Sequence, residues 1–515
     1  MQKALQNNGG FILKNILDRD VPKKVSSYTN LEPYYGSSNK DIIKNNDKLI
    51  DFEEVLDKLD IKDGMTISFH HHFREGDILL NKIIKNLAER GIKDLTLAPS
   101  SLTNVHSDTV IENVKKGVIK KIHTSGLRGK LGEEISNGLM GEPVIIRSHG
   151  GRAGAIETGR LDIDIAFIAA PTADIAGNVS GAEGPSACGA LGYAAVDARN
   201  AKKTVAFTDN IVDFPVKSIS IPQRLVDYVV EVNQIGDPSK IAKGALRKSV
   251  DTPPKNMIVA SKVAEIIRGS RYFKEDFSLQ TGSGSISLET ISLLKKIMIE
   301  KEITGSFLMG GITSGHVDLL ENGLFKKIFD TQSFDIGAVE SINKNKLHLE
   351  IDASDYANPF NKGPLVNNLD FVILSALEID LDFNVNVLTG SDGVLRGASG
   401  GHSDTAFGSN ISIIVAPSIR GRMPTIKESV TTVITPGSDI DILVTERGIC
   451  VNPKREDIKE DIRKNTSLDI IEINELKEKI ESITKPANSI EFKDNIVGLV
   501  EYRDGTIIDV VREIK

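Results

Sequence analysis

Short apolar runs alternate with amphipathic helical stretches along most of the chain, and this alternation constrains the fold more than any other feature. The clearest unit runs from MTISF (65–69) through the helical stretch 77–91 to DLTLAP (94–99), which predicts a strand, a helix and a second strand. Further runs such as IDIAFIAAP (163–171) and KTVAFTDN (203–210) are almost continuously apolar. Continuous apolar strands are typical of parallel sheets that helices cover on both faces. The sequence therefore predicts an α/β fold built on open, mainly parallel sheets.

A change in sequence texture after about residue 225 divides the 515-residue chain. The charged segment RKSVDTPPKN (247–256), with its paired prolines, is typical of a connection between domains. A second series of strand and helix patterns follows it, and a chain of this length is too long for one ordinary core. We predict two α/β domains, residues 1–245 and residues 250–515.

The composition argues against several classes of protein. The formal net charge is −8, whereas nucleic-acid binding requires a concentrated basic surface. No apolar run is long enough to predict a membrane span, and the N-terminus lacks the pattern of a signal peptide. Two cysteines, Cys188 and Cys450, provide no disulfide framework and are typical of a reducing cytoplasm. We therefore expect a soluble, cytoplasmic protein that binds neither nucleic acid nor a membrane.

Polar, glycine-rich segments follow five of the predicted strands. In open parallel sheets, ligands bind at the carboxyl ends of the strands, so these segments form the candidate site. They are HHHFREGD (70–77), HGGRAGAIETGR (149–160), TGSGSIS (281–287), GITSGHVDLLENG (311–323) and TGSDGVLRGASGGHSDTAFGSN (389–410). Glycine leaves backbone N–H groups open to phosphates or to a developing oxyanion, and histidine and arginine suit an anionic substrate.

Three consecutive histidines, His70, His71 and His72, raise the question of a metal site. Neighbouring side chains on an extended chain point in alternate directions, and no carboxylate or cysteine stands at the spacing of a zinc motif. We therefore predict no metal, and we interpret these histidines and Arg74 as donors to an anionic substrate. Packed or capping histidines are the alternative interpretation.

Four stretches together resemble the α subunit of citrate lyase, a citrate CoA-transferase. They are GGRAGAIETGRLDIDIAFIAAPTADIAGNVSG, LQTGSGSISLET, GITSGHVDLLENGLFKKIFDTQSFD and LRGASGGHSDTAFGSN. The resemblance covers nearly the whole chain and implies a CoA-transferase fold of two open α/β domains with the active site between them. It implies that citrate replaces acetyl on a thioester, giving citryl-thioester and acetate, before a separate lyase subunit forms oxaloacetate.

The resemblance also implies the partners and the co-substrate. The thioester would belong to an acyl carrier protein, the γ subunit, which bears a CoA-derived prosthetic group, and acetyl-CoA would be its surrogate. The β subunit would cleave the citryl-thioester, and a homo-oligomer is expected. No cofactor would be bound covalently to this chain.

This reaction assigns roles to the polar segments. A carboxylate must attack a thioester carbonyl, so the site needs donors for an oxyanion and cations for a tricarboxylate. The predicted catalytic loop contains Gly400, Gly401, His402 and Asp404. The predicted CoA-binding segment contains Gly282, Ser283, Gly284 and Ser285, and its glycine amides are alternative oxyanion donors. The predicted substrate-binding residues are His70, His71, His72, Arg74, Arg152 and Arg396.

Glu321, in LLENG, is the candidate nucleophile for a covalent route. CoA-transferases that it resembles carry their catalytic glutamate either in an S-E-N-G context or in a G-I-H-T-E-M context before a helix. By register, GITSGHVDLLENG matches the second pattern, and the glutamate position then falls at about Gly315. We therefore favour direct attack by a citrate carboxylate in a ternary complex, with Glu321 at a helix end. Glu340 and Asp404 are other carboxylates that could serve.

The sequence leaves three alternative functions open. Two share the fold: a citramalate CoA-transferase and an acetyl-CoA hydrolase. The third belongs to a different class and is a non-catalytic scaffold subunit of the lyase complex.

Overall fold

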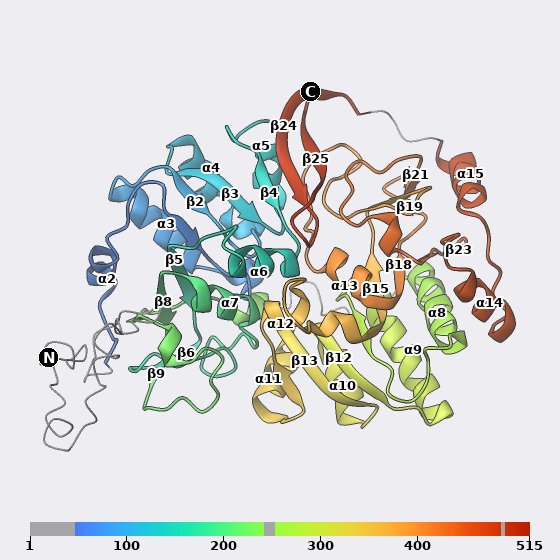
Figure 1. The fold of residues 1–515 in the computed structure, drawn as a ribbon, viewed down its shortest axis with the longest axis horizontal. Coiled ribbons are helices and arrows are strands. Elements are labelled where there is room, and N and C mark those ends of the chain that lie inside the picture. The colour runs from blue at the N-terminus through green and yellow to red at the C-terminus, as the bar shows by residue number, and fades with distance from the viewer. Residues whose placement is uncertain (1–46, 242–252, 486–489) are drawn as a thin grey trace, which may run out of the picture. The chain divides into compact units, whose positions relative to one another are not determined.

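The computed structural model describes residues 47–241, 253–485 and 490–515. Two large, mainly parallel sheets organise this part of the chain (Figure 1), which confirms the predicted α/β class. The expected domain connection falls mostly on residues 242–252, outside the described residues. The division at 245–250 therefore stays a prediction. Among the described residues, no helix combines the length and the apolar character needed to cross a membrane.

The first sheet has nine strands in the order β10-β8-β5-β1-β2-β3-β4-β24-β25, and only β24 and β25 pair antiparallel. The strands are β1 (Thr66–Ser68), β2 (Leu95–Leu97), β3 (Ile119–Thr124), β4 (Val144–Ile146), β5 (Ile165–Ala169), β8 (Lys203–Thr208), β10 (Tyr228–Glu231), β24 (Phe492–Glu501) and β25 (Ile507–Ile514). The accompanying helices are α2 (Phe52–Lys58), α3 (Leu79–Glu89), α4 (Ser107–Lys115), α5 (Gly129–Ser136), α6 (His149–Glu157) and α7 (Gly192–Asn200).

The second sheet has eight strands in the order β14-β13-β12-β11-β15-β18-β22-β23, and only β22 and β23 pair antiparallel. The strands are β11 (Leu279–Thr281), β12 (Gly305–Ile312), β13 (Phe325–Ser333), β14 (His348–Glu350), β15 (Leu369–Ser375), β18 (Ser409–Val415), β22 (Ile442–Val444) and β23 (Ile449–Val451). The helices are α8 (Pro254–Gly269), α9 (Ser285–Lys301), α10 (Ser314–Glu321), α11 (Ile336–Lys344), α12 (Ala353–Ala357), α13 (His402–Gly408), α14 (Glu456–Asn465) and α15 (Ile473–Thr484).

A small three-stranded sheet of the same plan accompanies each large sheet. In one, β6 (Thr172–Asp174) pairs antiparallel with β7 (Val179–Ser180) and parallel with β9 (Ile211–Val212). In the other, β16 (Glu378–Asp380) pairs antiparallel with β17 (Val385–Asn386) and parallel with β21 (Ile426–Lys427). A two-stranded piece, β19 (Ile419–Arg420) and β20 (Met423–Pro424), completes the strands. The shared plan indicates that the two halves are built alike.

The C-terminal hairpin crosses the predicted domain division. Strand β24 pairs in parallel with β4, from Gly498 opposite Val144 to Val500 opposite Ile146, and Figure 1 shows the hairpin beside β4. Val497, Val500 and Val511 are buried in the same core as the first sheet. The last residues of the chain therefore complete the sheet that its first half begins.

Local expectations and observed elements differ in two informative places. The stretch 149–160 was expected to be a glycine-rich loop, but residues 149–157 form helix α6. The side chain of Ser148 caps this helix by accepting a hydrogen bond from the Gly151 N–H group. Likewise, residues 402–408 of the expected loop 389–410 form helix α13. Both helix starts contain a glycine that close packing requires, since a Cβ atom at Gly150 would lie 2.1 Å from the Ala357 oxygen and one at Gly401 would lie 2.4 Å from the Tyr356 oxygen.

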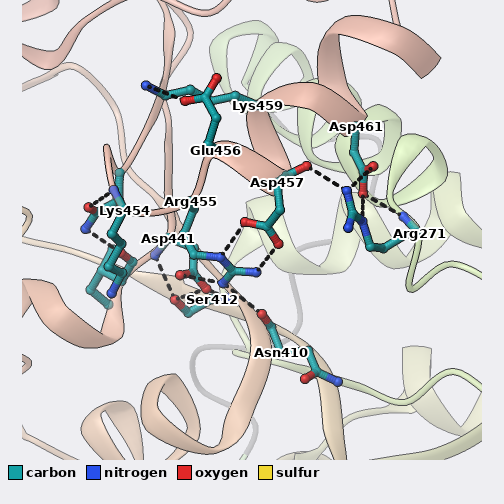
Figure 2. Close-up of polar contacts among 12 residues, drawn as sticks. Arg271, Asn410, Ser412, Asp441, Lys454, Arg455, Glu456, Asp457, Lys459 and Asp461 are labelled. Atoms are coloured by element: carbon teal, nitrogen blue, oxygen red, sulfur yellow. Dashed lines mark hydrogen bonds and ion pairs between the residues drawn. The ribbon is translucent and has the colours of Figure 1, made fainter.

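Ion pairs hold the highly charged helix α14 against the second sheet (Figure 2). Arg455, just before α14, lies 2.7 Å from Asp441 Oδ1, and it donates to both carboxylate oxygens of Asp457 at 3.0 and 3.1 Å. Arg271, just after α8, donates to Asp461 of α14 at 2.9 and 3.0 Å. These contacts join α14 to α8 and to the start of β22.

Candidate active site

A cavity of about 1110 Å³ lies where the carboxyl ends of central strands from both sheets meet. His71, Arg74 and Arg128 line it from the first half, after β1 and β3, and the segments 281–287 and 397–402 line it from the second half. Both sheets therefore deliver polar residues to one cavity. This agrees with the rule that ligands bind at the carboxyl ends of parallel strands.

The three consecutive histidines have three separate environments. His70 Nε2 lies 3.0 Å from Asp197 Oδ2, and His72 Nε2 lies 2.8 Å from the carbonyl oxygen of Ala169. His71 Nδ1 lies 2.6 Å from Ser100 Oγ, and of the three only His71 lines the cavity. Burial lowers the pKa of His72 to about 4 and that of His71 well below its usual range. The geometry thus favours a substrate contact for His71 and packing roles for His70 and His72.

Arg152, predicted to bind substrate, makes a buried ion pair instead. Its Nη1 and Nη2 atoms each donate to a carboxylate oxygen of Asp197 at 2.7 Å, and Nη2 also donates to the carbonyl oxygen of Ala98 at 2.7 Å. Arg152 does not line the cavity. The prediction is corrected here, because an arginine whose guanidinium is engaged with a buried aspartate is not free to bind a substrate carboxylate.

Arg74 and Arg128 present the opposite arrangement. Both line the cavity, and across the described ranges neither guanidinium forms an ion pair with a carboxylate. Arg74 lies over the ring of Phe334, 4.6 Å from its centroid. Burial lowers the pKa of both arginines, and the charge of Arg128 lowers the pKa of Arg74 further. Glu75 acts on both arginines only through space, and two partly buried cations without an ion-paired carboxylate form a site for an anion.

His149 and Tyr193 stand beside this cationic corner. The His149 ring lies 4.5 Å from the Tyr193 ring and 5.7 Å from the His71 ring, centroid to centroid. Burial, reinforced by Arg152 and Arg128, lowers the pKa of His149 to about 3, so the imidazole is neutral at pH 7. Its Nδ1 atom is buried without a hydrogen-bond partner among the described residues. His149 is therefore a neutral polar residue of the cavity lining.

The glycine-rich loop before α13 supplies backbone donors. Gly400 and Gly401 line the cavity, and no described residue accepts a hydrogen bond from either N–H group. Gly400 has a φ of +56°, a conformation that glycine adopts easily. Gly401 passes so close to Tyr356 that a Cβ atom there would lie 2.4 Å from the tyrosine oxygen. These two amides are candidates for holding an oxyanion.

His402 and Asp404, predicted to belong to the catalytic loop, are engaged elsewhere. His402 lines the cavity, but its Nδ1 lies 2.7 Å from Thr435 Oγ1 and its Nε2 lies 3.1 Å from the carbonyl oxygen of Ser375. Asp404 is buried outside the lining, where it accepts hydrogen bonds from Ser148 Oγ and the Gly150 N–H group, both at 2.8 Å. Direct roles for these two side chains are corrected to structural ones, because their hydrogen-bonding groups are already occupied.

The predicted CoA-binding segment reaches the cavity as a whole. Gly282, Ser283, Gly284 and Ser285 all line it, ahead of the 17-residue helix α9. Asn256 donates to Ser285 Oγ at 2.8 Å. The free N–H groups and the dipole at the start of a helix favour a phosphate or another anion, so the geometry suits the predicted role.

Arg396 and Glu321 complete the predicted set. Arg396 lines the cavity, but its side chain is 47 % exposed and it pairs with Asp392. Glu321 is the exposed last residue of α10 and does not line the cavity. Among the residues that the structure describes, no aspartate or glutamate lines this cavity. The helix-end interpretation of Glu321 fits this position.

The comparisons with known proteins agree with this geometry. A family model described as "Citrate lyase, alpha subunit (CitF)" matches residues 46–514. The chain belongs to this family. The citrate lyase alpha chain of Klebsiella pneumoniae is 49 % identical over 492 residues, covering 94 % of this chain and 96 % of that relative. The Haemophilus influenzae citrate lyase alpha chain is 51 % identical over 463 residues, covering 90 % and 92 %.

Solved structures extend the likeness to the fold. A Streptococcus mutans structure, described as an alpha subunit of citrate lyase in complex with citrate, aligns with a TM-score of 0.90 at 48 % identity and covers 97 % of this chain and 99 % of its own. The malonate decarboxylase alpha subunit of Acinetobacter baumannii aligns with a TM-score of 0.64 at 15 % identity, covering 85 % and 88 %. The second likeness shows the fold alone. As a member of the citrate lyase alpha family, the chain is a component of a multi-subunit lyase.

Sequence reasoning missed several residues of this site. Arg128 follows strand β3 and His149 follows strand β4, so both stand where the strand-end rule looks for ligands. Arg128 lies outside the five polar segments of the sequence, and His149 lies in HGGRAGAIETGR beside arginines that are the more obvious ligands for an anion. Tyr193, Gln280 and Tyr356 also line the cavity, but no local sequence signal distinguishes them.

Proposed function

We propose that this chain is the transferase component of citrate lyase and exchanges the acetyl group of a carrier thioester for citrate, giving citryl-thioester and acetate. The observation that carries the proposal is the pair Arg74 and Arg128, two cavity arginines without carboxylate partners among the described residues. Arg420 also lines the cavity without a carboxylate partner in the described ranges, but it donates to the Ala376 carbonyl oxygen at 3.0 Å. They stand in the same cavity as the free amides of Gly400 and Gly401. A tricarboxylate site and an oxyanion site therefore share one space.

Citrate would bind in the corner formed by the two arginines and the two cavity histidines. Arg74 and Arg128 can each bind a carboxylate bidentately, and neutral His71 and His149 can hydrogen-bond to carboxylate or hydroxyl groups. The Streptococcus mutans relative, described as a complex with citrate, supports citrate as the ligand. Citramalate carries one carboxylate fewer than citrate, so a competition assay between the two acids separates a citrate pocket from a citramalate pocket.

The carrier's thioester would lie between this corner and the glycine-rich loop. A citrate carboxylate oxygen attacks the acetyl carbonyl carbon, and the amides of Gly400 and Gly401 hold the resulting oxyanion. Collapse of the tetrahedral intermediate expels the carrier thiolate and leaves a citric–acetic mixed anhydride. The thiolate then attacks the citryl carbonyl and expels acetate, so the exchange has no net uptake of protons. One oxyanion donor is worth about 10²–10³ in rate.

The absence of a carboxylate from the described lining supports this direct route over a covalent glutamyl intermediate. A nucleophilic glutamate must reach the thioester carbonyl, whereas Glu321 is exposed at the end of α10 and Glu340 is exposed on α11. Buried Asp404 is already bonded to Ser148 and Gly150. The chain's own role is then to bind, orient and exclude water.

The remaining assignments follow from this reaction. The CoA-derived arm of an acyl carrier protein, or acetyl-CoA as its surrogate, would place phosphate groups at the start of α9, beside Ser283, Ser285 and Asn256. A lyase subunit would then cleave the citryl-thioester. The arm belongs to the carrier, so this chain needs no cofactor bound covalently to itself.

Mass spectrometry of the full-length chain mixed with acetyl-CoA and citrate, then quenched in acid, tests the proposal. We expect citryl-CoA and an unmodified protein mass. A CoA-sized adduct on a glutamate would refute the direct route. Loss of acetyl-CoA without citryl-CoA, equal with and without citrate, would indicate a hydrolase. No reaction of acetyl-CoA at all would indicate a scaffold.

A further inference from the structure

A buried contact behind the glycine-rich loop brings three distant parts of the chain together. Asp404 lies in the first turn of α13, directly after the loop, and is 0 % exposed. Arg503, at the turn of the C-terminal hairpin, is 5 % exposed, and its Nε atom lies 3.6 Å from Asp404 Oδ1. Ser148 Oγ and the Gly150 N–H group, at the start of α6, donate to the two oxygens of Asp404.

We propose that Arg503 is a positioning residue, through which the C-terminal hairpin fixes the Gly400–Gly401 amides against His149. This inference rests on the proposed function, because it assigns a purpose to the oxyanion amides. Arg503 does not line the cavity, so it would act through the residues that it contacts, Asp404 among them.

The contacts of Arg503 anchor it on the second half. Its Nη2 atom donates to the carbonyl oxygen of Ala357 at 3.2 Å, and its guanidinium lies 4.6 Å from the centroid of the Phe407 ring. Its neighbour Tyr502 donates to Asp439 at 2.6 Å. Ala357 belongs to α12 and Phe407 to α13, so the turn of the hairpin contacts both α12 and the helix that carries Asp404.

The hairpin itself belongs to the first half. Strand β24 pairs with β4, and Glu501 accepts hydrogen bonds from Nε and Nη2 of Arg147 at 2.6 and 2.7 Å. Arg147 comes immediately before Ser148 and His149. The same backbone that carries His149 is therefore tied to the hairpin on one side and to Asp404 on the other.

The direct link between the two halves of the site is short. The His149 N–H group donates to the Gly400 carbonyl oxygen at 2.8 Å. Glycine at 150 permits the approach of α12 and Asp404, because a Cβ atom there would lie 2.1 Å from the Ala357 oxygen and 2.7 Å from Asp404 Oδ1. Since Gly150 also donates to Asp404, we expect a shift of Asp404 to move the neighbouring His149 N–H group and with it the Gly400 contact.

The charge of Arg503 also bears on the ionisation of Asp404. Burial raises the pKa of Asp404 above its usual range, and Arg503 partly offsets this effect. The other titratable groups that sense Asp404 are Tyr193, Tyr356 and Tyr502, all with raised pKa values and neutral at pH 7. Arg503, together with the hydrogen bonds from Gly150 and Ser148, therefore favours the ionised form of Asp404.

The experiment compares the full-length Arg503→Met and Arg503→Lys variants with the wild type. Arg160→Met is the matched control, because Arg160 also approaches Glu501 of the hairpin, at 3.9 Å, without contacting Asp404. For Arg503→Met we expect kcat for citryl-CoA formation to fall roughly ten- to a hundred-fold, as small misplacements do, while the KM for citrate stays within about twofold. Arg503→Lys should recover part of kcat, and Arg160→Met should retain the wild-type value.

Two further readouts separate positioning from general destabilisation. Amide hydrogen exchange across residues 397–404 should be faster in Arg503→Met than in Arg160→Met, and the acid limb of its kcat–pH profile should move to higher pH as the pKa of Asp404 rises. Unchanged exchange in this loop, or equal kcat losses in Arg503→Met and Arg160→Met, would overturn the inference. If the wild type forms no citryl-CoA, the proposed function fails, whereas the exchange comparison still decides whether Arg503 fixes the loop.

Discussion

Two arginine environments lie side by side in the first half and have opposite character. Arg152 donates to both oxygens of Asp197, and His70 lies 3.0 Å from the same carboxylate. Arg74 and Arg128 line the cavity without a carboxylate partner among the described residues. A cation paired with a buried carboxylate stabilises the fold, whereas one without a carboxylate partner holds electrostatic potential for a ligand.

The histidines repeat this contrast. His402 has a partner on each ring nitrogen, whereas His149 has a buried Nδ1 atom without a partner in the described part of the chain. The described polar residues therefore divide into those engaged by the protein outside or at the edge of the cavity and those, such as His149, that line it. The division predicts which substitutions damage the fold and which damage only binding.

The largest expected effect comes from breaking the buried ion pair between Arg152 and Asp197. Asp197→Ala leaves Arg152 buried without a counter-charge, so we expect the free energy of unfolding to fall by about 3–5 kcal/mol. Denaturant titration measures this change. Glu340→Gln is the control, because Glu340 pairs with Lys344 on the surface and should matter by less than about 0.5 kcal/mol. A fall in the free energy of unfolding of less than about 1 kcal/mol for Asp197→Ala would contradict the stabilising role assigned to the Arg152–Asp197 pair.

A smaller effect should appear in the pH dependence of stability. Burial lowers the pKa of His402 to about 4, whereas an unfolded histidine has a pKa of about 6.5. The unfolded chain therefore binds more protons between these values, and the stability contributed by His402 falls as pH decreases through this window. Burial raises the pKa of Glu350 to about 7, which acts in the opposite direction above pH ~4.5.

His402→Gln isolates the histidine contribution. The slope of the unfolding free energy against pH, between pH ~4.5 and ~6, should become shallower by about one proton, or ~1.4 kcal/mol per pH unit. Urea titrations at several pH values measure the slope. An unchanged slope would mean that His402 is not held neutral.

Arg396 is intermediate between the arginines that pair with a carboxylate and those that line the cavity without one. It lines the cavity, but it is half exposed and paired with Asp392. We expect Arg396→Met to raise the KM for citrate by less than about threefold, because solvent screens an exposed cation. Steady-state kinetics with acetyl-CoA decides the point. A rise of more than about thirtyfold would move Arg396 into the substrate site.

Glu321 should show the smallest effect. Because it is exposed and lies outside the cavity lining, Glu321→Gln should keep kcat within about twofold of the wild type, whereas loss of a nucleophile typically costs orders of magnitude. The same kinetic assay applies. A loss beyond about a hundredfold would restore Glu321 as the nucleophile.

The sequence predicted the fold class because its periodicity is local. Apolar residues at helical spacing in 77–91 become the buried Ile83, Ile84 and Leu87 of α3, and the continuous apolar run 163–171 becomes the buried strand β5. The strand-end rule also located the cavity segments 281–287 and 397–402. Each of these inferences depends only on neighbours in sequence.

The inferences that went wrong depend on distant partners. Arg152 and Arg128 are indistinguishable as isolated arginines, and only Asp197, 45 positions away from Arg152, separates them. The pairing of β24 with β4 joins residues more than 350 positions apart, and no local sequence pattern predicts it. The sequence therefore located the site, whereas the identity of its free side chains required the fold.

Titration calorimetry of citrate, without an acyl donor, tests the central claim most directly. The Arg74→Met/Arg128→Met double variant should bind citrate about 100-fold or more weakly than the wild type, since each charge-assisted contact contributes roughly 1.5–3 kcal/mol. Its midpoint of thermal unfolding should not fall, because no ion pair to a described carboxylate is broken. Citrate affinity equal to the wild type, in a folded double variant, would contradict the account.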